Sequence, residues 1–129
     1  MSSQCCVDPG AKQIHETQGE YKTIDEINTY QTGNGKSAVL VCTDIFGAAF
    51  INARQIADRI AANTNTTVFV PDCFNGDPMD PDASNLWDLL PAWLGKHPTS
   101  EACRIAEKIF HSIKSKFQSI QVENSSNIK

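Results

Sequence analysis

Two largely apolar segments that flank an amphipathic segment constrain the fold of this chain more than any other feature. The first is Ser37–Thr43 and the second is Thr66–Val70, and both contain β-branched residues. Continuous apolar runs of this length are typical of strands buried on both faces, as in a parallel sheet that helices cover. Between them, five apolar residues recur at helical spacing: Ala53, Ile56, Ala57, Ile60 and Ala61. A strand, a helix and a second strand in this order predict a βαβ unit with parallel strands, and therefore the α/β class.

The helix of this unit has a start signal and a stop signal. Asn52 is suited to cap its N-terminus, and Gln55, three residues later, matches the second half of a capping box. The polar segment Asn63–Asn65 ends the helix. Pro71 ends the second strand, because proline cannot donate a hydrogen bond to a strand ladder.

Further elements are expected before and after this unit. The alternating stretches Tyr21–Ile24 and Ile27–Tyr30 predict a small antiparallel hairpin. Asp72–Ser84 is rich in proline and aspartate and is predicted to be a loop. Residues 85–94 form a short amphipathic stretch that Pro91 interrupts.

The last third of the chain predicts a second long helix. From Ser100 onward, apolar residues form one helical stripe: Ala102, Ile105, Ala106, Ile109, Phe110, Ile113 and Phe117. Phe117–Val122 is compatible with the start of a third parallel strand, but the chain turns polar from Glu123 onward instead. We therefore divide the chain into an irregular arm (1–19), an α/β domain (20–122) and a polar tail (123–129).

The charge pattern argues against several kinds of partner. The formal net charge is −4, and Lys and Arg form no run. The chain thus lacks the basic patch that nucleic acids or an anionic membrane surface require. No apolar stretch approaches the roughly 18–20 residues of a membrane span, and the first residues do not resemble a secretory signal. We expect a cytoplasmic protein with no nucleic-acid and no membrane partner.

The cysteines do not predict a disulfide framework or a metal site. There are five of them, an odd number, and none forms a C-x-x-C motif: Cys5, Cys6, Cys42, Cys73 and Cys103. Cys42 and Cys103 fall on apolar faces, where a thiol usually behaves as a small hydrophobe. The Cys5-Cys6 pair is compatible with a metal site or a redox role, but no second pair of ligands completes a zinc set. We predict no metal and no cofactor.

Candidate ligand-binding loops lie where the two central strands end, because open α/β sheets bind ligands beyond the carboxyl ends of their strands. These loops are Thr43–Gly47 and Pro71–Pro78, and neither contains a phosphate-binding glycine motif. One interpretation of the first loop is that it directs backbone N–H groups at a developing oxyanion. The other is that Gly47 turns the chain while Ile45 and Phe46 pack on the core. The spacing alone leaves both open.

Two sequence strings resemble the dienelactone hydrolase family, and most closely its eukaryotic, fungal-type branch. They are Thr43-Asp44-Ile45-Phe46-Gly47 and Val70-Pro71-Asp72-Cys73-Phe74-Asn75-Gly76-Asp77-Pro78, accompanied by Cys5-Cys6, Asn52 and Ala57-Asp58. The resemblance extends, in order, over most of residues 5–122. It implies an α/β-hydrolase fold and the hydrolysis of carboxylic esters or lactones. It also implies a Cys-His-Asp triad whose cysteine lies in a G-x-C-x-G elbow.

The resemblance assigns roles to particular residues of the two loops. Ile45 matches the position whose backbone N–H helps to form the oxyanion hole. Asp44 matches an acidic position beside the nucleophile. Phe46 would line the substrate pocket, and we expect Phe74 to bind substrate as well.

The chain departs from the family pattern at the nucleophile, since it contains neither G-x-C-x-G nor G-x-S-x-G. Cys42 lies inside a buried strand, where a thiol is inert. Cys73 lies at the right edge but has no neighbouring histidine to activate it. We therefore expect a partial α/β-hydrolase fold, with a hairpin, a parallel βαβ unit and further helices but without its C-terminal half. The resemblance implies a small-molecule ester or lactone as the substrate, but we expect this chain to be catalytically incomplete.

The alternative is a non-catalytic module that binds a small molecule or dimerises. A hydrophobic ligand would then lie near Phe46, Phe74 and Trp87. An open sheet edge beside an uncovered apolar helix face would favour self-association of the chain.

Overall fold

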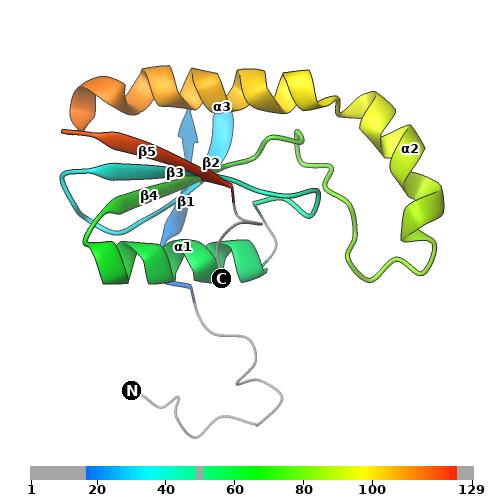
Figure 1. Cartoon of the computed structure of the whole chain (residues 1–129), viewed down its shortest axis with the longest axis horizontal. Coiled ribbons are helices and arrows are strands. Elements are labelled where there is room, and N and C mark those ends of the chain that lie inside the picture. Colours follow the sequence, from blue (N-terminus) through cyan, green and yellow to red (C-terminus); the bar gives the residue numbers. More distant parts are fainter. Residues whose placement is uncertain (1–16, 49–50, 125–129) are drawn as a thin grey trace, which may run out of the picture.

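The computed structural model describes residues 17–48 and 51–124, which form a mixed sheet with helices on both of its faces (Figure 1). The strands follow the order β1-β2-β4-β3-β5 across the sheet. They are β1 (Glu20–Ile24), β2 (Ile27–Thr32), β3 (Ala38–Cys42), β4 (Thr67–Pro71) and β5 (Ile120–Asn124). The helices are α1 (Ile51–Thr64), α2 (Leu86–Lys96) and α3 (Thr99–Ile113), followed by a 3₁₀ turn at Lys114–Lys116. The chain is therefore of the α/β class.

The predicted βαβ unit and hairpin are both confirmed. β3 and β4 pair in parallel on either side of α1 in the sequence, and β5 adds to the other edge of β3, also in parallel. β1 and β2 form an antiparallel hairpin, and β2 pairs antiparallel with β4. The hairpin turn places Asp25 and Glu26 at φ values of 50° and 69°, the backbone sign that a type I′ turn requires.

The core is divided by the sheet into two clusters, because alternate residues of a strand point to opposite faces. Val39 and Val41 of β3 belong to the cluster that packs on the small residues Ala57 and Ala61 of α1. Leu40 of β3 belongs to the cluster beneath α3, which also holds these residues: Phe69, Phe74, Met79, Trp93, Ile105, Ile109 and Ile113. Burial on both faces explains why the central strands are continuously apolar.

Two details of the predicted helices are wrong. Asn52 does not cap α1, because the helix includes Ile51 and Asn52 lies within its first turn. Asparagine is tolerated there because the first N–H groups of a helix have no intrahelical acceptors in any case. Pro91 does not interrupt the stretch after the loop, since α2 continues through it from Leu86 to Lys96. The carbonyl of Trp87 loses its helical donor, but Trp87 is 78% exposed, so water can replace that donor.

The sequence left a third parallel strand after α3 open, and the structure forms one as β5, which pairs in parallel with β3 and ends at Asn124. Cys103, expected on an apolar face, is exposed on α3. The Cys5-Cys6 pair and most of the arm lie outside the described residues. None of the helices in the described ranges has both the length and the apolar character that crossing a bilayer demands.

Candidate functional site

The Asp44–Gly47 turn follows β3 at the carboxyl edge of the parallel strands. Oδ1 of Asp44 accepts a hydrogen bond from the Phe46 N–H at 3.0 Å, and the Gly47 N–H donates to the Asp44 carbonyl at 3.1 Å. Gly47 has a φ of 79°, and a Cβ added to it would lie 2.9 Å from Cβ of Pro78. Glycine is therefore required by both the backbone conformation and the space available.

The carbonyl and the side chain of Ile45 hold this residue in the turn, whereas its backbone N–H has no hydrogen-bond acceptor among the described residues. The carbonyl accepts a hydrogen bond from the Met79 N–H at 2.8 Å. The side chain is partly buried against the cluster beneath α3. The Ile45 N–H donates to no acceptor among residues 17–48 and 51–124. The packing of Ile45 on the core agrees with one of the two interpretations that the sequence left open, and the turn also leaves one backbone donor without an acceptor among the described residues.

The two aromatic candidates both pack into the protein. Phe46 is partly buried against the cluster beneath α3. Phe74 is 6% exposed and lies edge-on to the ring of Trp93, with 4.9 Å between ring centroids. Trp87, the third residue of the expected hydrophobic site, lies on the exposed side of α2. Phe46 and Phe74 thus support the loops at this edge through their packing.

Asp77 and His97 form a contact that the sequence did not predict. Nε2 of His97 lies 2.8 Å from Oδ2 of Asp77, and Nε1 of Trp93 donates to the Asp77 carbonyl at 2.6 Å. The hydrogen bond from His97, followed in effect by the charges of Lys96 and His97, lowers the pKa of the Asp77 carboxyl. His97 is buried beside the ring of Phe74. Asp77 therefore fastens the loop after β4 to the C-terminal end of α2.

Cys73 is placed as a core residue and not as a nucleophile. Its side chain is 4% exposed. Burial, with smaller contributions from Cys42 and Asp72, raises the pKa of the Cys73 thiol to about 12. No hydrogen bond joins this thiol to a histidine within the part of the chain that the structure describes. At neutral pH Cys73 is a protonated, inert thiol.

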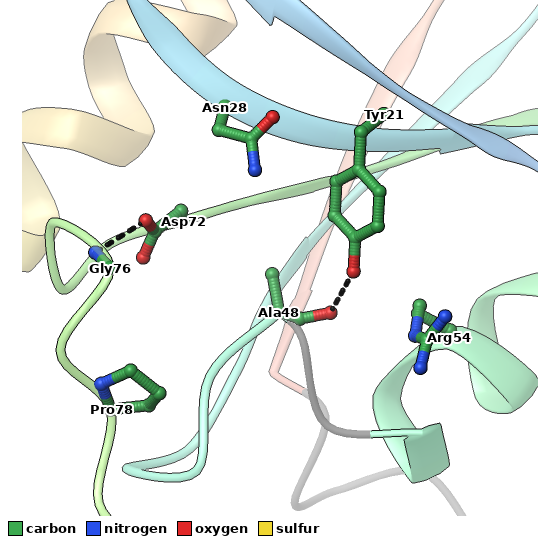
Figure 2. A pocket seen from close by; sticks show the side chains of 7 residues that line it. All are labelled: Tyr21, Asn28, Ala48, Arg54, Asp72, Gly76 and Pro78. Atoms are coloured by element: carbon green, nitrogen blue, oxygen red, sulfur yellow. Dashed lines mark hydrogen bonds between the residues drawn. The ribbon is translucent and has the colours of Figure 1, made fainter.

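A pocket of about 410 Å³ opens beside the Asp44–Gly47 turn, on the side of β1 and β2 (Figure 2). Its walls come from β1, β2, the ends of the two candidate loops and the first turns of α1: Tyr21, Asn28, Ala48, Arg54, Asp72, Gly76 and Pro78. Of these residues, only Asp72, Gly76 and Pro78 belong to the loops that the sequence predicted to bind a ligand. Tyr21 and Arg54 were missed because each is an ordinary surface residue of an amphipathic element until the fold brings them together.

The relatives that this chain resembles include proteins named as hydrolases and as carboxymethylenebutenolidase homologs. Hydrolase pyvD of Aspergillus violaceofuscus is 38% identical over 99 residues, which are 74% of this chain and 39% of that protein. The carboxymethylenebutenolidase homolog of Mus musculus is 40% identical over 98 residues, 72% of this chain and 38% of that protein. The Rattus norvegicus homolog is 33% identical over 118 residues, 88% of this chain and 46% of that protein.

The chain thus spans less than half the length of the curated relatives it matches. No family model matches it. Carboxymethylenebutenolidase is another name for dienelactone hydrolase, so the relatives with that name confirm the family that the sequence resemblance predicted. The chain belongs to the dienelactone hydrolase family.

Proposed function

We propose that these residues provide the oxyanion-binding side of a site that hydrolyses carboxylic esters or lactones. The observation that carries this proposal is the backbone N–H of Ile45, which has no acceptor among the described residues although the turn around it is held by hydrogen bonds. A donor held in place before the reaction stabilises the negative charge of a tetrahedral intermediate without further reorganisation. Asp44 supports the donor by accepting the neighbouring Phe46 N–H, and it places a carboxylate beside the reaction centre.

The strand order supports an assignment to the first part of the α/β-hydrolase fold. β3, which leads into the oxyanion turn, lies between β4 and β5 in the sheet. In the family pattern the nucleophile elbow follows the next parallel strand, and we infer that β5 is this strand. The elbow motif itself is not among the 129 residues. We therefore propose that the chain by itself does not hydrolyse esters, and that a nucleophile and a histidine from outside these residues complete the site.

The proposal is tested by two measurements of ester hydrolysis with p-nitrophenyl acetate. The purified 129-residue chain should show no saturable turnover. A chimera that joins it to the remaining C-terminal part of the Mus musculus relative should hydrolyse the ester, and iodoacetamide should abolish this activity. In the chimera, Ile45→Pro removes the N–H and should lower kcat by about 10²–10³. Ile45→Leu keeps the N–H and should retain activity.

Two results contradict the proposal. Turnover by the purified chain that alkylation of its thiols abolishes would show that a nucleophile is already present. A chimera whose activity is the same with Ile45→Pro as with Ile45→Leu would show that this N–H binds no oxyanion. The alternative function, a non-catalytic binding module, predicts ligand-induced thermal stabilisation of the chain, with no hydrolysis by the chimera.

We also propose that the isolated chain self-associates along β5. Its outer edge pairs with no strand in the described part of the molecule, and Val122 on this strand is 54% exposed. An unpaired strand edge that carries an exposed β-branched residue favours pairing with another chain.

A further inference from the structure

The pocket beside the Asp44–Gly47 turn is separate from the proposed oxyanion site. Its walls are formed from the β1, β2 and β4 side of β3, whereas the proposed nucleophile position follows β5, on the opposite side of β3. Figure 2 shows Arg54 on the α1 wall, Asp72 on the wall formed by the loop after β4, and the ring of Tyr21 between them. The pocket is therefore available for a ligand that does not take part in the hydrolysis.

Arg54 lines this pocket and has one buried donor without a partner in the described part of the chain. Its Nε is buried and has no acceptor within the described ranges, and its guanidinium makes no ion pair with any residue described there. Arginine is always charged at neutral pH, and its donors match the two oxygens of a carboxylate. A buried donor without an acceptor is costly, so this group favours an anionic ligand.

Asp72, the carboxylate on the opposite wall, is bonded to backbone donors and makes no ion pair with Arg54. Oδ1 of Asp72 accepts from the Phe74 N–H at 3.0 Å, and Oδ2 accepts from the Gly76 N–H at 2.7 Å. These donors hold the Asp72 carboxylate in its own turn. Arg54 thus retains the donors that are free to meet an incoming anion.

The remaining walls provide apolar surface. The Tyr21 hydroxyl donates to the Ala48 carbonyl at 3.1 Å, which fixes the phenol ring across the pocket (Figure 2). Pro78 and the methyl group of Ala48 add further apolar contact. A ligand with a carboxylate at one end and a flat or short apolar body at the other matches this arrangement of one cation and an apolar wall.

We propose that this pocket binds a small organic carboxylate, whose oxygens accept hydrogen bonds from Arg54 and whose apolar body packs on Tyr21 and Pro78. The site goes beyond the proposed hydrolytic function and does not depend on it. A ligand bound there contacts Ala48, the residue that follows the oxyanion turn, so occupancy of the pocket stabilises the conformation of that turn.

The experiment compares benzoate with benzamide, which has nearly the same shape but no charge. Isothermal titration of the 129-residue chain should show benzoate binding about tenfold more tightly than benzamide, since a charge-assisted pair replaces a neutral one. Arg54→Gln should abolish this preference. Arg59→Gln is the matched control, because Arg59 is an exposed residue on the same helix that does not line the pocket, and it should preserve the preference.

A second measurement locates the ligand in the unmodified chain and does not depend on the folding of any variant. Benzoate should shift the backbone amide resonances of Ala48, Arg54 and Gly76 in an ¹H–¹⁵N spectrum. Equal affinity for benzoate and benzamide, no binding of benzoate, or shifts centred elsewhere would each overturn the proposal. So would an Arg54→Gln variant that has a native circular dichroism spectrum and retains the preference for benzoate.

Discussion

Aspartates give the loops at the carboxyl edge of the sheet their shape. Asp44, Asp72 and Asp80 each accept a hydrogen bond from the backbone N–H two residues later, at 2.9 to 3.0 Å. This arrangement lets a short side chain satisfy a backbone donor that no strand or helix can reach. The same residue type thus supports both the Asp44–Gly47 turn and the long loop before α2.

Asp77 makes the attachment of α2 dependent on pH. The hydrogen bond from His97 lowers the pKa of Asp77 in the folded chain below its ordinary value of 3.8. A carboxyl group with a lowered folded pKa stabilises the fold above its unfolded pKa, and this contribution is lost as the pH falls through the folded pKa. We therefore expect the free energy of unfolding to fall below about pH 4, and Asp77→Asn to lessen this dependence.

Urea unfolding followed by tryptophan fluorescence between pH 3 and pH 6 measures the effect. Asp82→Asn is the control, because Asp82 is an exposed carboxylate of the same loop whose side chain makes no ion pair within the described residues. An acid dependence that is identical in Asp77→Asn and Asp82→Asn would contradict the assignment to Asp77.

At the scale of elements, α2 tolerates an internal proline because the residue whose carbonyl loses its hydrogen-bond donor is exposed to water. Trp93 is buried, whereas Trp87, whose carbonyl Pro91 leaves without its helical donor, is an exposed residue. The helix is attached through its buried side and its C-terminal end, where Trp93 and His97 contact Asp77. Tertiary contacts therefore maintain a helix that its own sequence weakens.

Pro91→Ala should stabilise the chain, since it restores the helical donor and removes the clash of the proline ring. We expect the free energy of unfolding to rise by about 1–2 kcal/mol, less than the full cost of an interior proline because alanine also frees the unfolded chain. Urea titration monitored by circular dichroism measures this change. Pro98→Ala is the opposite case: Pro98 caps α3 in an extended conformation, so its loss should destabilise slightly. A decrease in stability for Pro91→Ala would refute this account of α2.

For the whole molecule, the order of strands places an antiparallel hairpin at one edge of the sheet and β5 at the other edge (Figure 1).

If the purified chain self-associates through β5 as proposed, Val122→Lys should shift it toward monomer, because a lysine on an edge strand opposes pairing with another chain. Size-exclusion chromatography with light scattering over a range of concentrations measures this shift. Lys22→Val on β1 tests the other edge and should leave the association through β5 in place. A Val122→Lys variant with the same mass distribution as the unmodified chain would exclude β5 as the interface.

The sequence by itself determined the fold class and the parallel core of this protein. A strand buried on both faces must be apolar throughout, and a helix that covers a sheet must carry an apolar stripe. Both patterns are local and can be read along the chain. The family resemblance likewise rests on two contiguous strings, one of which contains the Asp44–Gly47 turn.

Only the tertiary structure decided which side chains meet. Asp77 and His97 are twenty residues apart, and Tyr21 and Arg54 belong to β1 and α1, which two strands, β2 and β3, separate in the sequence. The continuation of α2 through Pro91 was also decided at this level, since exposure of one side of the helix is a property of the packed molecule. Contacts between distant segments depend on how the sheet brings them to one edge, and no local pattern of residues records that arrangement.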